Sequence, residues 1–447
     1  MSLRTESIRA QLAISPQSSR QLSERLKISQ SSVSRAIAEL GDAVVRFGSA
    51  QSIQYTLFDT ARNLPDISIY RINTEGQIRK LGTLLPVRPD GFVMRQEDGV
   101  TIHSDGLPWW LFDMRPQGYL GRAYAARYGV EMGVPTRLNE WTDTHALRGL
   151  LHNGHDMVGN LLLGEISRLR FLDTVVPNPI LEIHKSYEYS LLSLEAARGE
   201  VPGSSAGGEQ SKFTTYAMTA DGPRHVIVKF TELEVSNVSE RWRDLLLIEH
   251  LALDTLSEAG IQAAKTQIID YGTQRFLEIE RFDRIDSLGR RALISLAAFD
   301  AEFVGSGAGI WPIITRRLAD DGHIYQEAVD ATNLLWAFGT LIGNTDMHYG
   351  NLSFISDHGR PYNIAPAYDM TAMAFAPRSG GGLPDVIPEA NIHESVSNEI
   401  WLRAEGFART FLTRVMNENR FSSRFQPCIT ALQLHIEAAS VKIQRLG

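Results

Sequence analysis

The sequence of 447 residues has almost no cysteine and no long apolar run. Its one cysteine, Cys428, excludes an intramolecular disulfide and a cysteine-rich metal site, which suits a reducing compartment. No apolar run reaches the roughly 18 residues that a membrane span requires. Arg4, Glu6 and Arg9 interrupt the N-terminal stretch where a signal peptide would need an apolar core. We therefore expect a cytoplasmic protein without a membrane segment.

The chain also lacks the basic excess of a protein that coats nucleic acid, because its net charge is −8. This charge is unevenly distributed. Residues 1–58 contain seven Lys or Arg and four Asp or Glu, which gives this segment +3 and leaves −11 for the remainder. The asymmetry is typical of a DNA-contacting appendage on an acidic body. The length allows two or three domains.

Residues 1–58 have the pattern of a small winged helix-turn-helix. The sequence predicts a serine-capped helix over 18–26 and a second helix over 30–40. Two alternating stretches, 44–48 and 53–57, predict the strands of a wing. The outward positions of the second helix suit a DNA groove and are Gln30, Ser31, Ser32, Ser34 and Arg35. A helical docking module that contacts only protein is the alternative.

The remainder shows a β-rich half followed by a helical half. We expect a β-rich subdomain over 59–165, a lobe over 166–284 that carries the Gly/Ser-rich segment and the strand with Lys229, and a helical lobe over 285–447. The first helix of that last lobe is expected over 292–298. The apolar, aromatic-dense segment 107–114 is expected in the core and not at a ligand site.

The stretch 341–354 carries the main functional signal. Asp346 is followed five positions later by Asn351, within a polar, glycine-containing segment that lies between a helix pattern and a strand pattern. Protein kinases use this spacing, the Asp to accept a hydroxyl proton and the Asn to hold magnesium. A second apolar run ends at Asp369, and Mg²⁺ usually takes one or two carboxylates plus substrate phosphates. The alternative is a polar surface turn.

Three further stretches match parts that a kinase needs. Segment 201–213 is rich in Gly and Ser, so its backbone N–H groups can approach phosphates, although a flexible linker is the alternative. Lys229 lies in an apolar strand pattern where it needs a partner, and Glu249 on the following helix is the candidate. The strand pattern 276–284 ends where a kinase hinge would present free main-chain groups to adenine.

Together these stretches resemble the HipA family of serine/threonine kinases, the toxin half of bacterial toxin–antitoxin pairs. The resemblance rests on Ser205-Ala206-Gly207-Gly208-Glu209-Gln210-Ser211-Lys212, Val228-Lys229-Phe230, Glu280-Arg281-Phe282-Asp283-Arg284, Asp346-Met347-His348-Tyr349-Gly350-Asn351 and Tyr368-Asp369. The fused N-terminal module is similar to the subgroup called YjjJ. The resemblance implies an α+β, protein-kinase-like bilobal fold, with a β-rich N-lobe and a helical C-lobe, behind the winged helix-turn-helix.

The resemblance also implies a reaction, in which the γ-phosphate of ATP is transferred with Mg²⁺ to a protein Ser or Thr. An aminoacyl-tRNA synthetase or another translation component is the implied type of target. Implied catalytic residues are Asp346, Asn351 and Asp369, of which Asn351 and Asp369 would hold the metal. The implied ATP-binding residues are Ser205, Ala206, Gly207, Gly208, Glu209, Gln210, Lys229, Glu280, Phe282 and His348. Inhibitory autophosphorylation is implied at Ser205 or Ser204.

Two other functions remain open on the sequence. One is a DNA-binding transcription regulator whose kinase-like body only senses a nucleotide. The other is a kinase that acts on a small molecule such as a sugar or a choline-like alcohol. Intact Lys229, Asp346, Asn351 and Asp369 argue against an inactive kinase fold. Because a helix-turn-helix usually acts as a dimer on two half-sites, a homodimer or an antitoxin partner is expected.

Overall fold

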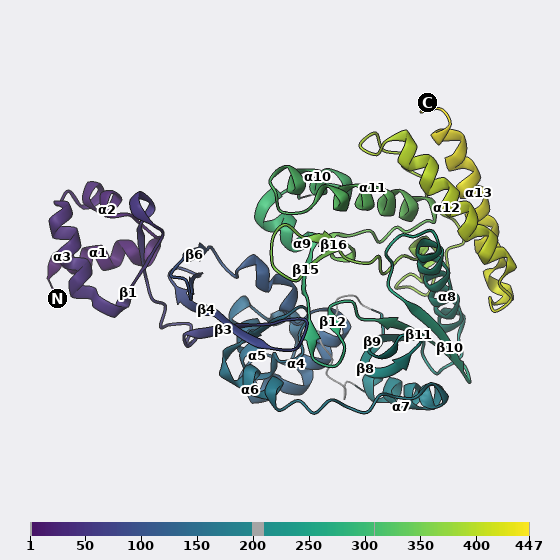
Figure 1. The fold of residues 1–447 in the computed structure, drawn as a ribbon, viewed down its shortest axis with the longest axis horizontal. Coiled ribbons are helices and arrows are strands. Elements are labelled where there is room, and N and C mark those ends of the chain that lie inside the picture. The colour runs from purple at the N-terminus through teal and green to yellow at the C-terminus, as the bar shows by residue number, and fades with distance from the viewer. Residues whose placement is uncertain (1, 199–209, 308, 447) are drawn as a thin grey trace.

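The computed structural model of the chain describes residues 2–198, 210–307 and 309–446. The expected loop residues Ser204, Ser205, Ala206, Gly207, Gly208 and Glu209 therefore lie outside the described residues. A small N-terminal unit projects from a larger body, in which two sheets meet a helical region (Figure 1). Over the described ranges, we find no helix of the length and apolarity needed to cross a membrane.

The N-terminal unit contains three helices and a two-stranded antiparallel sheet. Its elements are α1 (Leu3–Ile14), α2 (Ser19–Leu26), α3 (Gln30–Leu40), β1 (Val44–Phe47) and β2 (Gln54–Leu57). The side chains of Ser18 and Ser29 cap α2 and α3, which is why these helices start where the sequence predicts. Apolar residues from all three helices and β2 form a separate small core, made by Ile8, Leu12, Leu22, Val33, Ala36, Leu40 and Leu57.

The next region contains an antiparallel sheet with the strand order β6-β5-β4-β3-β7. Its strands are β3 (Ile67–Ile72), β4 (Ile78–Val87), β5 (Gly91–Gln96), β6 (Thr101–Ser104) and β7 (Leu161–Leu163). Three helices, α4 (Gly118–Met132), α5 (Asp143–Asn153) and α6 (Gly164–Leu172), accompany the sheet. A core that includes Ile69, Phe92, Tyr124 and Leu147 joins the sheet to α4 and α5. A 3-10 segment, Trp109–Met114, connects this region to the helical part of the body.

The second sheet has the antiparallel order β10-β11-β9-β8. Its strands are β8 (Lys212–Thr219), β9 (Gly222–Phe230), β10 (Thr266–Tyr271) and β11 (Gln274–Glu280), and its helices are α7 (Lys185–Ala197) and α8 (Asn237–Glu258). Successive residues of a strand point to opposite faces. Phe276 accordingly packs toward α7, while Leu277 packs toward α8. The two helices therefore cover opposite faces of the sheet.

The rest of the chain is mostly helical and encloses a large core. Its elements are β12 (Arg284–Ile285), β13 (Gly289–Arg290), β14 (Ala292–Ser295), α9 (Leu296–Phe299), a π-helical turn (Asp300–Val304), α10 (Trp311–Asp320), α11 (Gln326–Leu341), β15 (Ser353–Ser356), β16 (Asn363–Ile364), α12 (Asn398–Asn417) and α13 (Gln426–Ile443). The prediction of a helix over 292–298 is wrong for its first four residues. Residues 292–295 form β14 and pair with β15, and α9 begins only after Ser295, whose side chain caps it. Pairing with a distant strand decided this short apolar run.

Candidate active site

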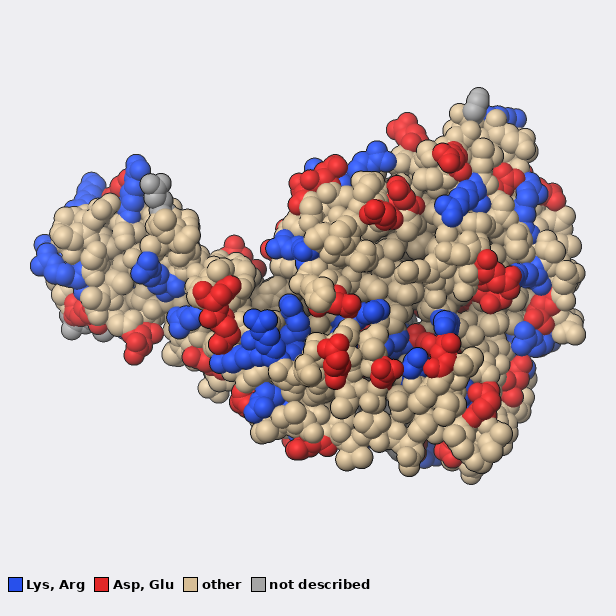
Figure 2. Space-filling model, in the orientation of Figure 1, with Lys and Arg blue, Asp and Glu red and all other residues tan. Residues whose placement is uncertain are grey.

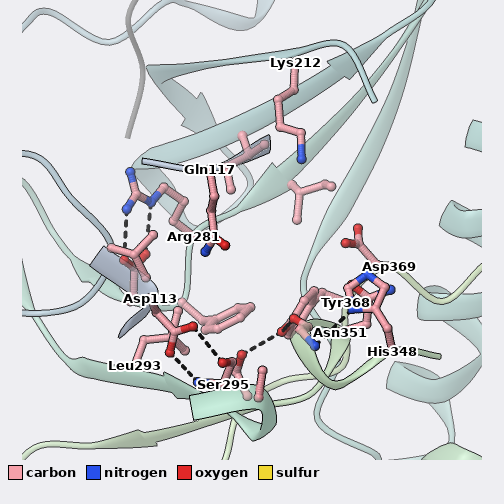
Figure 3. Close-up of a pocket in the computed structure, with 18 of the residues that line it drawn as sticks. Asp113, Gln117, Lys212, Arg281, Leu293, Ser295, His348, Asn351, Tyr368 and Asp369 are labelled. Atoms are coloured by element: carbon pink, nitrogen blue, oxygen red, sulfur yellow. Dashed lines mark hydrogen bonds and ion pairs between the residues drawn. The ribbon is translucent and has the colours of Figure 1, made fainter. Parts of the chain in front are cut away.

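A cavity of about 230 Å³ lies where the four-stranded sheet meets the helical region. Six of the residues expected at an active site line it, namely Lys229, Glu280, Phe282, His348, Asn351 and Asp369. They come from β9, the end of β11, the loop after α11 and the segment after β16. Residues far apart in the sequence thus share one cavity (Figure 3).

Lys229 is held at this cavity by two carboxylates. Its ammonium donates to both oxygens of Glu249 on α8, at 2.7 and 2.8 Å, and forms an ion pair with Asp369. Lys229 and Glu249 are 5% and 2% exposed. Burial opposes the charge on Lys229, but Asp369 and Glu249 outweigh it and raise the pKa of the ammonium above its ordinary value. Lys229 is therefore a fixed positive charge at the cavity wall.

Asp369 has an unusual backbone conformation. Its φ is +50°, in the left-handed region that non-glycine residues seldom adopt and that Asp tolerates better than most. Burial raises the pKa of this carboxyl, but the charges of Lys229 and Lys212 and the hydrogen bond from Lys229 together outweigh burial and lower the pKa overall. The carbonyl of Ala367 accepts a hydrogen bond from the Ala264 N–H, which fixes the segment leading to Asp369 against the chain before β10. The carboxylate is thus ionised and positioned.

The loop after α11 positions Asn351 through its own backbone. The Asn351 side-chain amide donates to the Asp346 carbonyl at 2.8 Å, and the Asp346 N–H donates to Asn344 Oδ1 at 3.1 Å. His348 Nδ1 accepts a hydrogen bond from the Gly350 N–H. Asp346 itself is exposed and does not line the cavity. The structure therefore brings Asn351 and His348 to the cavity and leaves the Asp346 carboxylate outside its wall.

The segment expected to form a kinase hinge, at the end of 276–284, agrees only partly with the prediction. Glu280 and Phe282 line the cavity, but the N–H groups of Glu280 and Arg281 donate to the carbonyls of Lys265 and His225. The expectation of freely available main-chain groups is therefore wrong for these two amides, because His225 in β9 and Lys265 just before β10 already accept their hydrogen bonds.

Several cavity residues were not identified from the sequence as site residues. Phe112, Asp113, Gln117 and Val158 belong to the region of the five-stranded sheet and form one wall. Asp113 accepts hydrogen bonds from the N–H and the hydroxyl of Ser295, both at 2.6 Å, and burial raises the pKa of its carboxyl. The segment 107–114 was expected in the core and not at a ligand site, which holds for Leu111 and Met114, whereas Phe112 packs against the core and also lines the cavity, as Asp113 does. The charge of Asp113 within an apolar run was the available signal.

Two further residues extend the site. Lys212 faces Lys229 across the β8–β9 ladder, is buried and lines the same cavity. The Tyr368 hydroxyl donates to the Gly350 carbonyl at 2.7 Å, and its oxygen lies 2.6 Å from the Ser353 hydroxyl. Tyr368 thereby connects the loop that carries Asn351 to the segment that carries Asp369 (Figure 3).

The donor set at this cavity suits a hard divalent cation that arrives with phosphates. The Asn351 amide nitrogen is engaged by Asp346, so its oxygen is the group left for a cation, and Asp369 supplies a carboxylate. Mg²⁺ typically takes one or two such protein ligands and completes its shell with water and phosphate oxygens. No group of three or more His, Cys, Asp or Glu side chains with metal-binding geometry occurs in the described part of the chain.

The residues expected to contact DNA lie on one helix of the N-terminal unit. Gln30, Ser31, Ser34 and Arg35 are exposed on α3, and Ser32 is partly exposed. The buried face of α3 is formed by Val33, Ala36 and Leu40, so these polar residues point away from the core. Lys and Arg side chains are spread over the visible face of this unit (Figure 2).

Comparisons with known proteins support a single family. The model for the middle domain of YjjJ-like toxins matches residues 63–172, and that for the HipA-like C-terminal domain matches residues 204–432. The chain is 37% identical over 434 residues to Toxin YjjJ of Escherichia coli strain K12, which covers 97% of both chains.

Two solved structures are also similar. One is HipA of Shewanella oneidensis MR-1, solved with HipB and its operator DNA, with a TM-score of 0.50, 13% identity and coverage of 85% of this chain and 97% of that one. The other is the Helicobacter pylori proinflammatory kinase CtkA, with a TM-score of 0.39, 13% identity and coverage of 53% and 93%. The fold of the present chain is mixed helix and sheet, like that of HipA. The chain belongs to the YjjJ-like toxins with a HipA-like C-terminal domain.

Proposed function

We propose that this protein is an ATP-dependent serine/threonine protein kinase of the HipA-like type, fused to a DNA-binding module. The observation that carries the proposal is the contact of Lys229 with both Glu249 and Asp369 at a cavity that Asn351 also lines. Phosphoryl transfer depends mainly on placement of the reactants and on neutralisation of charge. A fixed ammonium, a carboxylate and an amide oxygen around one cavity supply these requirements.

Each residue has a role in this proposal. Lys229 neutralises phosphate charge, and Glu249 orients Lys229. Asn351 and Asp369 would hold Mg²⁺, which would neutralise phosphate charge when bound. Asp346 accepts the proton of the attacking hydroxyl. The exposure of Asp346 suits this role, since the acceptor must be reached by a residue of another protein.

Two parts of the proposal rest on the family resemblance. The loop residues Ser205, Ala206, Gly207, Gly208, Glu209 and Gln210 would cover the phosphates, and Ser205 or Ser204 would be the site of inhibitory autophosphorylation. The protein target would be an aminoacyl-tRNA synthetase or another component of translation.

We also propose that residues 1–58 form a winged helix-turn-helix that binds DNA, as a homodimer or with an antitoxin. The exposed polar face of α3, with Gln30, Ser31, Ser32, Ser34 and Arg35, would enter the major groove. The Shewanella relative was solved with its antitoxin HipB and with operator DNA. Replacing Arg35 by Gln should weaken binding to the cognate operator without changing phosphoryl transfer.

The decisive experiment is incubation of the purified chain with [γ-³²P]ATP and Mg²⁺. Asp369→Ala and Asp346→Ala should abolish incorporation, while Asp330→Ala, which removes an exposed carboxylate from α11, should leave it unchanged. Circular dichroism of all variants checks that each is folded. Retained incorporation in both site variants would refute the kinase proposal. ATP turnover without any labelled protein, before and after addition of cell extract, would point to a small-molecule kinase.

A further inference from the structure

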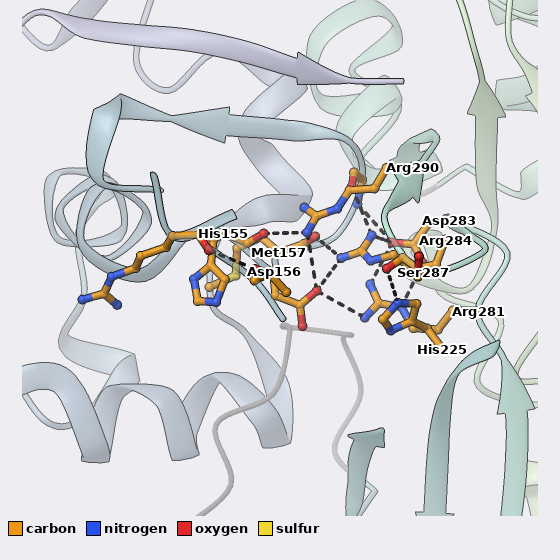
Figure 4. A network of polar contacts seen from close by, with 12 residues as sticks. His155, Asp156, Met157, His225, Arg281, Asp283, Arg284, Ser287 and Arg290 are labelled. Carbon is orange, nitrogen blue, oxygen red and sulfur yellow. Dashed lines mark hydrogen bonds and ion pairs between the residues drawn. The ribbon is translucent and has the colours of Figure 1, made fainter. Parts of the chain in front are cut away.

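A network of three buried arginines and two aspartates lies beside the hinge, next to the candidate active site, whose cavity Arg281 and Asp283 also line (Figure 4). Asp283 accepts hydrogen bonds from Arg281 at 2.9 Å through both of its oxygens and from Arg284 at 2.7 Å. Asp156 lies in the loop between α5 and β7, and its Oδ1 accepts a hydrogen bond from Arg284 at 2.9 Å. Arg290 and Arg281 lie 3.8 and 4.0 Å from the same oxygen. The network thus connects the five-stranded region to the hinge.

One side of this network faces a second cavity of about 270 Å³. The three arginines line it together with His155, Thr214 and Thr215. Arg281 lines both this cavity and the candidate active site, so the two cavities share that side chain as part of their walls. Guanidinium and hydroxyl groups thus share the lining with apolar side chains such as Phe171 and Leu288.

Three nitrogen atoms in this wall have no hydrogen-bond partner among the residues that the structure describes. They are Arg284 Nε, Arg290 Nη1 and His155 Nδ1, all of them buried. Buried polar groups in folded proteins are nearly always paired, so a cluster of unpaired nitrogens around one cavity indicates a missing acceptor. Burial and the neighbouring Arg284 lower the pKa of Arg290 well below its ordinary value, and its ion-pair partner, Asp156 Oδ1, lies 3.8 Å away.

The side chains that line this cavity indicate which class of ligand it binds. Guanidinium groups match phosphate oxygens in geometry and charge, and phosphate offers enough oxygens to accept several donors at once. The cavity is larger than a phosphate group alone needs, so it has room for an organic part. Asp156 is turned toward the opening, with 47% of its side chain exposed, and its Oδ2 accepts no hydrogen bond from the described residues. That oxygen suits a hydroxyl or amide donor of the ligand.

We propose that this cavity is a binding site for a phosphomonoester that carries a hydrogen-bond donor close to its phosphate. The phosphate accepts hydrogen bonds from Arg284, Arg290 and His155, and the donor binds Asp156. Phosphoserine in a protein and a sugar phosphate share this chemistry. The site is separate from nucleotide binding and does not depend on the proposed kinase activity.

The test measures binding to the full chain with Mg-ADP present at saturation, so that the active-site cavity is filled. Isothermal titration and thermal unfolding are followed with a phosphoserine peptide and with ribose 5-phosphate, beside the unphosphorylated peptide and ribose. We expect saturable binding and a higher unfolding temperature with at least one phosphorylated probe and with neither control. The better of the two probes identifies the source of the ligand. Absence of binding by both phosphorylated probes would overturn the proposal.

Variants locate the site. Arg290→Gln should weaken binding about tenfold, as expected for the loss of one charge-assisted hydrogen bond. His155→Gln is a second variant that leaves all three arginines in place, and it should weaken binding as well. Arg224→Gln is the matched control, because Arg224 pairs with Asp286 near the molecular surface and does not line the cavity. Equal affinity in the wild type and in the folded cavity variants would place the phosphate elsewhere and refute the assignment.

Discussion

Lys229 and Lys185 are both buried against a described glutamate, and Lys229 lies at the candidate active site whereas Lys185 does not. Lys229 pairs with Glu249 at the cavity. Lys185 pairs with Glu278 at 2.9 Å on the α7 face of the same sheet, and neither residue lines that cavity. Both pairs are nearly inaccessible to solvent. The chain therefore contains its own control for separating a structural ion pair from a functional one.

The first prediction compares Glu249→Gln with Glu278→Gln. Each change leaves a buried lysine without one carboxylate, and the free energy of unfolding should fall by up to about 3–5 kcal/mol in either case. Phosphoryl transfer should fall about 100-fold or more only in Glu249→Gln, because only that change frees the ammonium at the cavity. Urea unfolding and labelled-ATP incorporation measure the two quantities. Equal loss of incorporation in both variants would show that stability alone is responsible.

A buried histidine predicts how stability depends on pH. Burial lowers the pKa of His435 on α13, and its hydrogen bond to the Thr340 carbonyl only partly opposes this shift. The unfolded chain therefore takes up the proton first as the pH falls. The stabilisation from the neutral imidazole is present above the unfolded pKa of about 6.5 and is lost as the pH falls below it.

The second prediction follows from the direction of this pH dependence, a loss of stability as the pH falls. His435→Gln keeps a donor for Thr340 and removes the titration, so the loss of stability between pH 7.5 and pH 5.5 should become smaller than in the wild type. The urea midpoint at the two pH values measures it. His358→Gln, at an exposed position, should retain the wild-type dependence. A steeper dependence in His435→Gln would contradict the argument.

At the scale of elements, one glycine of α11, Gly339, lies close to the side chains of Met347 and Met370 in the two loops of the site. A Cβ at position 339 would lie 2.5 Å from Met347 Sδ and 3.3 Å from Met370 Sδ. These methionines are the neighbours in sequence of Asp346 and Asp369. Their flexible side chains can yield, so the cost falls on the position of the two loops and not on the fold.

The third prediction is that Gly339→Ala separates stability from activity. Alanine is favoured over glycine inside a helix by about 1 kcal/mol, so stability should be unchanged or slightly higher. Incorporation of labelled phosphate should fall several-fold because the two methionines must move. Gly406→Ala in α12 is the control, since a Cβ there meets no atom within 4 Å. Full activity in Gly339→Ala would show that the loops tolerate the displacement.

How far single elements can be predicted depends on their length. The long helices α8, α11, α12 and α13 are expected from apolar periodicity over 242–256, 325–342, 399–416 and 425–446, and each begins and ends within five residues of those bounds, because many periodic positions agree. The first part of the stretch 292–298 was assigned wrongly, because so short and mostly apolar a run fits a helix and a strand equally well. Its pairing with β15, residues 353–356, decided the outcome and is not visible locally.

At the scale of the whole molecule, the N-terminal unit is attached to the body through its own sheet. Phe47 of β1 stacks on His103 of β6 with ring centroids 4.7 Å apart, and packs with Leu85 and Val93. The Gly48 N–H donates to the Thr101 hydroxyl. The strands expected to form a wing are thus part of the contact with the five-stranded sheet.

The fourth prediction is that Phe47→Ala loosens this attachment. Truncation of a buried aromatic side chain costs about 3–5 kcal/mol, and here the loss falls on the contact between the unit and the body. Hydrogen exchange should become faster in β1 and β6, while labelled-phosphate incorporation should stay the same. Ile14→Ala, at an exposed position, is the control. Unchanged exchange in β6 would mean that the contact contributes little.

The sequence by itself determined the local elements and the list of reactive residues. Caps, periodicity and the spacing of Asp346 and Asn351 are properties of neighbouring positions, so they can be read without the fold. Only the tertiary structure decided that Asp113 and Val158 reach the active-site cavity and that three arginines meet Asp156. It also left the Asp346 carboxylate outside the cavity wall. The physical reason is that burial and charge pairing between distant segments depend on how sheets and helices pack, which local patterns do not specify.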